Sequence, residues 1–274
     1  MKYARLVPQP KKALNAKTSS RVASSDRKQA AGAQRPFAVF DIDGTLIRWQ
    51  LYHVMVDKLA SKGLLGPDAK QQLRDARMIW KRREHPESFK NYEQAIVRAY
   101  EDALQHLVAK DFDQMILGII DEYKDQTYVY TRDLLKQCKA DGYFLLIISG
   151  SHHELIEQIG KYYGFDDYVG THYGRKATGF SGDKHVASSN KAAVLKQLVE
   201  KHRLTYAGSL GIGDSGSDIA MLELVEKPVA FNPDKILFEK AKENNWLVVI
   251  ERKNMIYNLE PKDGQYLLVE TDQR

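Results

Sequence analysis

Phe-Ala-Val-Phe-Asp-Ile-Asp-Gly-Thr, residues 37–45, is the stretch that decides the fold of this 274-residue chain. Its apolar start is typical of a strand buried on both faces, and the glycine just past the strand lets the chain turn sharply. Asp41 and Asp43 then lie at the carboxyl end of that strand, which is the edge where ligands bind in open α/β sheets. Acidic turns are common after strands, so a functional reading requires more polar groups at the same edge.

Two later apolar segments end in the same way. Residues 143–148 stop at Ser149 and Gly150, and residues 207–214 close on Asp214 within the run Gly-Asp-Ser-Gly-Ser-Asp. Each segment is followed by a helical pattern. Because parallel strands end at one edge of a sheet, we expect these polar side chains to lie beside the two aspartates of the first stretch.

The chain beyond residue 128 alternates between strand and helix patterns. Further strands are predicted at residues 228–231 and 246–250, whereas residues 167–182, rich in Gly, Tyr and Thr, indicate a short hairpin or flap. Ser151 and Glu154 have the spacing of a capping box that opens a helix. Other helices are predicted at residues 130–140, 191–202, 219–225 and 234–244. The alternation predicts an α/β fold, with a Rossmann-like, mostly parallel sheet covered on both faces.

A helical region interrupts this pattern after the first strand. Apolar residues recur at a spacing of three to four, with no strand pattern between them, over residues 51–62, 67–83, 88–110 and 111–123. We therefore expect a sheet core from residues 36–48 and 129–251, with an inserted helical cap at residues 49–128. Residues 252–274 form an extension to which the sequence assigns no role.

The net charge of +5 is unevenly distributed along the chain. Residues 1–35 hold nine Lys or Arg and one acid, which leaves 32 basic and 35 acidic side chains in the remainder. This first segment lacks apolar periodicity and predicts a disordered basic tail. A loose contact of the tail with nucleic acid or anionic lipid, an organelle transit role and no role at all are each compatible with that composition.

Cysteine usage and hydropathy indicate the cellular setting. Cys138 is the only cysteine, so no internal disulfide forms and a reducing, cytoplasmic location is expected. No apolar h-region follows the basic residues of the tail, which argues against a secretory signal. The longest apolar runs are far shorter than the roughly 18 residues of a membrane helix, so we expect no stable membrane insertion.

The predicted strand edge collects several carboxylates. Asp41, Asp43, Asp214 and Asp218 would repel one another in one crevice unless cations compensate them, and Lys191 at a helix start is one such cation. Oxygen ligands suit Mg²⁺, and the lack of a His/Cys cluster argues against zinc. Such a site is suited to phosphoryl transfer, in which a carboxylate attacks phosphorus and a neighbouring carboxylic acid protonates the leaving oxygen.

These motifs, taken in order, resemble those of the haloacid dehalogenase superfamily. The resemblance rests on four motifs: Asp41-Ile-Asp-Gly-Thr45, the strand that ends at Ser149-Gly150, Lys191, and Gly213-Asp-Ser-Gly-Ser-Asp218. The helical insertion after the first motif looks like the first-position cap of that superfamily. Asn232-Pro-Asp234 looks most like its phosphoserine-phosphatase-like branch. The similarity covers residues 37–250.

The resemblance implies a role for each matching residue. It implies Asp41 as nucleophile and Mg²⁺ ligand, and Asp43 as general acid and base that also lends its backbone carbonyl to the metal. Asp214 would bind Mg²⁺, and Asp218 would support the metal site or the lysine.

The resemblance also implies a phosphate-binding set. Ser149 and Gly150 would bind phosphate oxygens, and Lys191 would neutralise the phosphoryl charge. Lys184 lies close by in a Gly-Asp-Lys turn and is the alternative lysine, although Lys191 is favoured by its place at a helix start. His152 and His153 are interpreted as exposed residues of a first helical turn, at the mouth of the crevice.

Other functions fit single motifs of the sequence. Gly211, Gly213 and Gly216 satisfy G-x-G-x-x-G, with Asp234 about twenty residues later, which would suggest a dinucleotide-binding oxidoreductase. The match falls late in the sheet, however, and an aspartate in the turn would repel a pyrophosphate. A Ca²⁺ loop starting at Asp41 fails because its twelfth residue is Tyr52, and no P-loop pattern occurs.

We therefore expect a Mg²⁺-dependent phosphatase that forms an aspartyl-phosphate on Asp41 and acts on a small phosphorylated metabolite. A phosphoamino acid, a phosphorylated amino alcohol, a sugar phosphate and a lipid phosphate all suit the motifs, as does transfer to an acceptor other than water. The non-enzymatic alternative is a basic-tailed binding protein on the same scaffold, and it is weakened because every position needed for turnover is filled.

Overall fold

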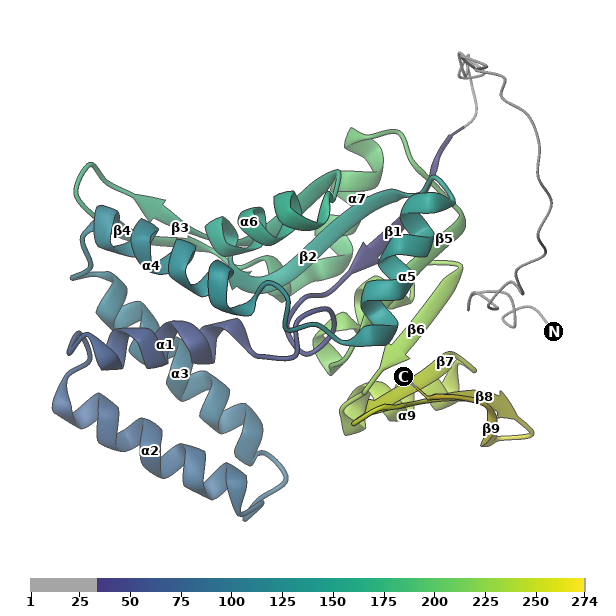
Figure 1. Cartoon of the computed structure of the whole chain (residues 1–274), viewed down its shortest axis with the longest axis horizontal. Helices are drawn as coiled ribbons and strands as arrows, with labels where there is room; N and C mark the ends of the chain where they lie inside the picture. Colours follow the sequence, from purple (N-terminus) through teal and green to yellow (C-terminus); the bar gives the residue numbers. More distant parts are fainter. Residues whose placement is uncertain (1–33, 274) are drawn as a thin grey trace, which may run out of the picture.

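The computed structural model describes residues 34–273, so the expected tail lies outside the described residues apart from its last two positions. A nine-stranded sheet runs through this part of the chain in the order β4-β3-β2-β1-β5-β6-β7-β8-β9 (Figure 1). The strands from β3 to β7 pair in parallel: β3 (Asp167–Arg175), β2 (Phe144–His152), β1 (Pro36–Phe40), β5 (Thr205–Gly213), β6 (Lys227–Phe231) and β7 (Leu247–Arg252). The mixed α/β fold with a mostly parallel sheet is confirmed.

Helices cover both faces of the sheet, as the alternation of side chains along β1 requires. Phe37 and Val39 pack on one face, and Ala38 and Phe40 pack on the other, because successive side chains of a strand point in opposite directions. The first face is covered by α7 (Lys191–Lys201), α8 (Ile219–Leu222) and α9 (Lys235–Glu243). The second face is covered by α5 (Val129–Ala140) and α6 (His153–Tyr163).

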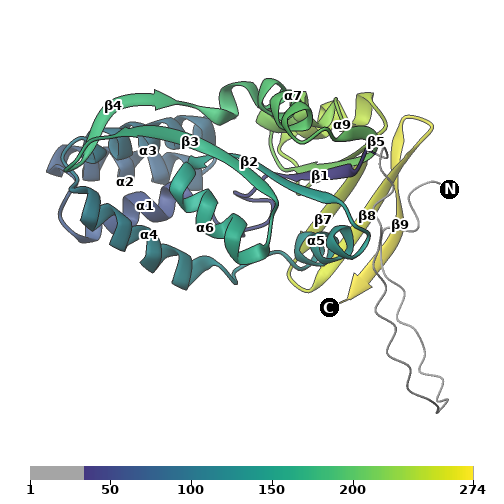
Figure 2. The same cartoon turned by 90° about the horizontal axis from the view of Figure 1, so that it is seen from above.

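The insertion after β1 consists of four helices, at the opposite end of the sheet from β8 and β9 (Figure 2). We name this segment, residues 51–123, the helical insertion. Its helices are α1 (Leu51–Ser61), α2 (Pro67–Lys81), α3 (Ser88–Leu104) and α4 (Ala109–Tyr123). The third helix ends six residues before the predicted limit of residue 110. Leu107 turns into the core there, and the Ala109 amide bonds the Thr178 carbonyl at 3.1 Å, so tertiary contacts override the helical periodicity.

The two linkers that join the helical insertion to the sheet run side by side. The Arg48 amide donates to the Gln126 carbonyl at 2.9 Å, and the Tyr128 amide donates to the Leu46 carbonyl at 3.2 Å. Ile47 forms an antiparallel bridge with Thr127 between these two bonds. The chain therefore leaves and re-enters the core through one paired crossing.

The region predicted as a flap is partly a strand of the main sheet. β3 pairs in parallel with β2, and then turns back antiparallel into β4 (Phe180–His185). Tyr173 and Phe180 belong to this hairpin, and both side chains are buried against the helical insertion. The predicted hairpin is present, but its first strand extends the sheet.

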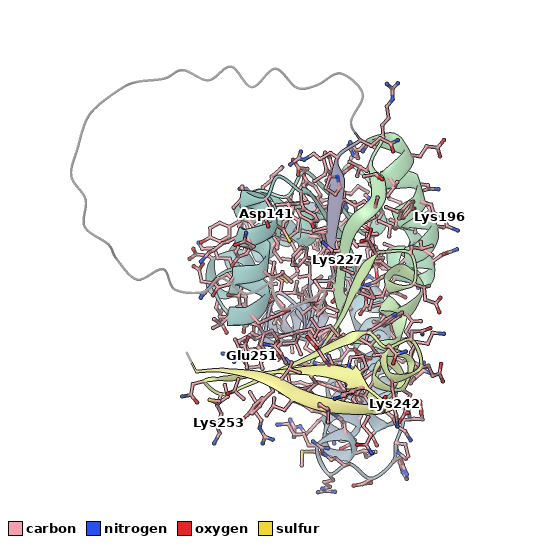
Figure 3. The ribbon with its side chains drawn as sticks, turned by 90° about the vertical axis from the view of Figure 1, so that its right-hand side faces the viewer. Asp141, Lys196, Lys227, Lys242, Glu251 and Lys253 are labelled. Atoms are coloured by element: carbon pink, nitrogen blue, oxygen red, sulfur yellow. The ribbon has the colours of Figure 1, made fainter. Side chains whose placement is uncertain are left out.

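The C-terminal residues, to which the sequence assigned no role, form a second antiparallel hairpin. β8 (Met255–Lys262) pairs with β7 and with β9 (Gln265–Gln273), and Figure 3 shows the hairpin across one side of the molecule, with Lys253 at its start. Asp263 and Gly264 both have positive φ, as the favoured two-residue hairpin turn requires. None of the helices within residues 34–273 is long and apolar enough to cross a membrane.

Candidate active site

The structure brings Asp41 and Lys191 into direct contact at the carboxyl end of β1. Asp41 is 5% exposed, and its amide donates to the Ile212 carbonyl of the neighbouring strand at 3.0 Å. The Lys191 ammonium lies 2.7 Å from Asp41 Oδ1 and 2.6 Å from Asp218 Oδ1. Lys191 is itself buried, because α7 starts at this residue directly above the strand edge. One cation thus bridges two carboxylates from segments far apart in the sequence.

Lys184, the alternative lysine, has a different partner. Its ammonium lies 2.7 Å from Glu101 Oε1 on α3, so it joins β4 to the helical insertion. Lys191 is the lysine that reaches Asp41.

Asp218 is held in place by the turn that follows β5. Its Oδ2 accepts bonds from the amides of Asp214 and Ser215, both at 3.1 Å, while its Oδ1 bonds Lys191. Ser215 and Asp218 form a reciprocal capping box, which explains their spacing. Both oxygens of Asp218 are therefore engaged within the protein.

Gly44 lets Asp214 approach the first motif. Its φ is +75°, and a Cβ on this residue would lie 2.1 Å from Asp214 Oδ2. A side chain at this position would be strained by its backbone and would also displace the aspartate. The close packing of Gly44 thus brings the end of β5 against the turn after β1.

The carboxylates at this edge are grouped closely enough to bind a cation. Asp41, Asp214 and Asp218 each offer an oxygen within 4.8 Å of the others. Hard carboxylate oxygens suit Mg²⁺. Because both oxygens of Asp218 already have partners, Asp41 and Asp214 are better placed as ligands, and Asp218 is placed to hold the lysine. Among the described residues, the Asp43 side chain is not part of this cluster.

Asp43 points instead toward the end of β2 and the start of the helical insertion. The Leu51 amide donates to its Oδ1 at 2.6 Å, and the Ser149 hydroxyl donates to its Oδ2 at 3.0 Å. The Gly150 carbonyl accepts a bond from Thr171 at 2.6 Å. Ser149 therefore contacts Asp43, and Gly150 is the next residue of β2.

Burial and crowding shift the ionisation of these groups. Burial raises the pKa of Asp41 to about 7, with Asp218 and Asp43 adding to the rise and Lys191 opposing it. Burial, and then the charge of Asp41, raise the pKa of Asp214 well above its usual range. Burial also raises the pKa of Asp43. Burial and crowding therefore favour the binding of protons or of a further cation at this edge.

His152 is fully buried, so the prediction of an exposed residue in a first helical turn is wrong for it. β2 continues through His152, whose ring nitrogens lie 2.5 Å from the Tyr100 hydroxyl and 2.6 Å from Glu154. The predicted capping box of Ser151 and Glu154 is also wrong, because α6 begins one residue later and the Glu154 carboxylate lies against His152 and Arg175 instead. Tyr100 comes from α3, so a non-local contact seals this strand end.

Sequence reasoning did not single out one acidic residue of the helical insertion that has a shifted pKa. Glu93 on α3 is half-buried, and burial, followed by the charges of Asp43 and Asp234, raises its pKa to about 7. Its polar character in a helical pattern is typical of a solvated face, and no local pattern tells which face of an inserted helix meets the sheet edge.

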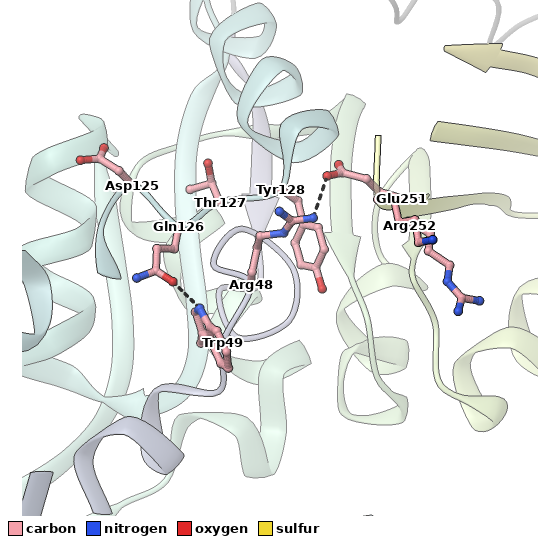
Figure 4. A pocket seen from close by; sticks show the side chains of 9 residues that line it. Arg48, Trp49, Asp125, Gln126, Thr127, Tyr128, Glu251 and Arg252 are labelled. Atoms are coloured by element: carbon pink, nitrogen blue, oxygen red, sulfur yellow. Dashed lines mark hydrogen bonds and ion pairs between the residues drawn. The ribbon is translucent and has the colours of Figure 1, made fainter. Parts of the chain in front are cut away.

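A pocket of about 600 Å³ lies beside the paired linkers rather than at the carboxylates (Figure 4). The two linkers and the turn after β7 line it. Arg48 pairs with Glu251 at 3.7 Å, and Trp49 bonds Gln126 at 2.5 Å. Glu251 in turn accepts the first amides of α5. The pocket therefore lies at the crossing between the sheet and the helical insertion.

The glycines of the dinucleotide-type pattern serve protein packing. A Cβ on Gly213 would lie 2.4 Å from Asp218 Cγ, and a Cβ on Gly211 would lie 3.0 Å from Leu222 on α8. The Asp218 carboxylate occupies the turn and accepts its amides. A pyrophosphate would meet negative charge there, so the geometry does not favour a dinucleotide site.

Comparisons with known proteins find several chains that are similar to this one. The chain is 25% identical over 226 residues to the inhibition of morphological differentiation protein of Streptomyces azureus, with 78% of each chain covered. It is 24% identical over 224 residues to a histidinol-phosphatase of Neisseria meningitidis, covering 77% of this chain and 97% of that protein. A phosphoserine phosphatase solved as a phospho-aspartyl intermediate analogue has a similar fold, with a TM-score of 0.56, 19% identity, and coverage of 81% and 95%.

The family assignment follows from a match that spans the strand edge. The model of the haloacid dehalogenase-like hydrolases matches residues 38–223, which include both aspartates after β1, the end of β2, the start of α7 and the turn after β5. The chain belongs to the haloacid dehalogenase-like hydrolases.

Proposed function

We propose that this protein is a Mg²⁺-dependent phosphomonoesterase in which Asp41 is the nucleophile. The observation that carries the proposal is the buried contact of Lys191 with both Asp41 and Asp218, with Asp214 packed alongside. A lysine held in this way fixes the orientation of Asp41 and leaves the second oxygen of that carboxylate for attack on phosphorus.

The proposed reaction has two steps. A carboxylate oxygen of Asp41 forms a bond to phosphorus, while the bond from phosphorus to the leaving oxygen breaks and Asp43 gives that oxygen a proton. A water molecule then attacks phosphorus, Asp43 takes the proton from this water, and the bond to Asp41 breaks. The raised pKa of Asp43 suits it to hold the first proton.

The other residues of the edge bind and neutralise the phosphoryl group. Ser149 and the Gly150 amide would bind its oxygens, and Lys191 would balance its charge. Asp41, Asp214 and the Asp43 carbonyl would hold Mg²⁺, which supplies charge neutralisation when it is bound.

We further propose that the helical insertion acts as a cap over the site, and that the whole cap comprises residues 49–128. It contacts the edge directly through the Leu51 amide on Asp43. Covering the edge would exclude bulk water and select the leaving group. The proposed substrate is a small phosphorylated metabolite, of the phosphoserine type or another, and the proposed setting is the cytoplasm.

A phosphate-release assay tests the function. The purified protein with Mg²⁺ should hydrolyse p-nitrophenyl phosphate and at least one member of a metabolite panel. Asp41→Asn should lower kcat by roughly 10⁴-fold or more, because no carboxylate remains to attack phosphorus. Asp102→Asn removes the same charge from an exposed position of α3 and should match the wild type. A near-normal rate in Asp41→Asn would exclude the covalent route.

A further inference from the structure

One helix of the insertion is strongly basic, whereas the remainder of the chain after residue 35 is acidic. Residues 62–83, which comprise α2 and the turns on either side of it, hold seven Lys or Arg and two acids. The rest of residues 36–274 holds 25 basic and 33 acidic side chains. An anionic surface would therefore attract α2 and repel most of the remaining surface.

Four exposed basic residues of α2 form a row along one side of the helix, which we name the basic stripe. They recur at spacings of four, three and four residues, and such residues lie above one another on a helix: Lys70, Arg74, Arg77 and Lys81. Within the described residues none of the four has an ionic partner, and the ion pair next to α2 joins Arg82 to Glu84 at 3.5 Å, beyond the stripe. The two acids, Asp68 and Asp75, are seven residues apart and lie on another side of the helix.

The helix that carries the stripe is held in place by a different side. Leu73, Ala76 and Trp80 pack against the core of the insertion, and Trp80 stacks on Tyr92 of α3 with ring centroids 5.3 Å apart. Figure 1 shows α2 as the helix of the insertion that lies farthest from the sheet. The basic stripe is thus carried on the outer part of the molecule, where a large partner can reach it.

An exposed apolar side chain lies beside the basic stripe. Met78 follows Arg74 by four residues and precedes Lys81 by three, so it neighbours both, and it is 40% exposed. Basic residues next to an exposed apolar side chain on one helix are typical of helices that lie on an anionic membrane. A single-stranded nucleic acid would require exposed rings on which its bases stack, whereas Trp80 of α2 is half-buried against Tyr92.

We propose that the basic stripe and Met78 form a surface that binds anionic phospholipid membranes, with α2 lying parallel to the bilayer. The lysine and arginine side chains would contact lipid phosphates, and Met78 would enter the headgroup region. This surface is separate from the strand edge, so the inference does not depend on the proposed phosphatase function.

Vesicle binding by the full chain tests the proposal. Vesicles of phosphatidylglycerol and phosphatidylcholine should bind the protein at least roughly tenfold more tightly than vesicles of phosphatidylcholine alone, and added salt should weaken the binding. The double variant Lys70→Gln/Arg74→Gln should lower the affinity for the mixed vesicles by roughly 25-fold, because each base near such a surface contributes about fivefold. Met78→Gln should lower it by a smaller factor.

A matched control removes the same charge from the other end of the molecule. Lys196 on α7 and Lys242 on α9 are exposed (Figure 3), and the double variant Lys196→Gln/Lys242→Gln should bind the mixed vesicles as the wild type does. Residues 1–35 are present in every variant, so any contact that they make with the vesicles cancels in the comparison. Melting temperatures show that each variant is folded.

Two results would overturn the proposal. If the α2 double variant and its control bind the mixed vesicles equally well, or if the wild type does not distinguish the two kinds of vesicle, the basic stripe is not a membrane surface. If the wild type binds a single-stranded oligonucleotide more tightly than the vesicles, and the α2 double variant loses that binding alone, the stripe is a nucleic-acid surface instead.

Discussion

The strand edge and the helical insertion treat their acidic side chains differently. At the edge, Asp218 has a partner for each oxygen, and Asp41 shares the same lysine. On the insertion, Glu101 pairs with Lys184, whereas burial and then the charges of Asp43 and Asp234 raise the pKa of Glu93 to about 7. The difference teaches that one buried lysine holds two carboxylates in place at the edge, whereas Glu101 on the insertion has a lysine to itself.

After the loss expected for Asp41→Asn, the largest effect would come from Asp43, the residue at which the two regions meet. Asp43→Asn keeps the bond from the Leu51 amide but cannot carry a proton to the leaving oxygen. We expect kcat for an alkyl phosphate to fall by roughly 10²–10⁴-fold, the usual contribution of general acid–base catalysis. An aryl phosphate, whose leaving group needs less protonation, should lose less. Equal losses for the two esters would remove Asp43 from the acid role.

A smaller effect is expected when the stability of the fold is measured against pH, and it tests whether the strand edge binds a cation. The pKa of Asp41 is about 7 in the folded protein and 3.8 in its unperturbed state. The folded protein therefore binds an extra proton between these values, and the stability of the metal-free protein should fall as pH rises from 4 through 7. Mg²⁺ competes with that proton, so its stabilising effect should grow over the same window.

Thermal unfolding at pH 5.5 and pH 8 measures this difference. At pH 8, Mg²⁺ at a hundredfold excess over its Kd should stabilise the fold by about 2.7 kcal/mol, or roughly 5–10 °C. Asp214→Asn should abolish the shift and should raise the melting temperature of the metal-free protein, because it removes a buried like charge beside Asp41. A larger Mg²⁺ shift at pH 5.5 than at pH 8 would contradict the assignment.

The smallest effect is expected where α3 contacts the end of β2. Tyr100→Phe removes the partner of a buried His152 nitrogen and should cost about 1–2 kcal/mol in the free energy of unfolding. Tyr92→Phe is the matched control, since Tyr92 is also buried on α3 and its hydroxyl makes no hydrogen bond in the described part of the chain. Denaturant unfolding compares the two variants. Equal losses would show that the Tyr100 hydroxyl is not what links the two regions.

The strand edge could be predicted because its information is local. Asp41, Ser149 and Asp214 each follow an apolar run directly, and parallel strands must bring such ends together. Lys191 was found from its place at a helix start, and the structure puts it on Asp41.

Other parts depend on contacts that no local pattern records. His152 is buried because Tyr100, 52 residues earlier, covers the strand end. The half-burial of Glu93 was not predicted either, since helical periodicity alone does not orient an inserted unit. The C-terminal hairpin is a different case, because Asp263-Gly264 is a recognisable turn pair that the analysis passed over in a polar segment.

The pairing of the two linkers determines how easily the helical insertion could be replaced by another unit. Ile47 and Thr127 are bridged, and hydrogen bonds flank them on both sides. If the residues between them were removed, a short turn could therefore join the two ends without moving β1 or α5. A different helical unit could be grafted onto the same two residues. The scaffold thus permits the helical insertion to be exchanged as one unit, with the strand ends left in place.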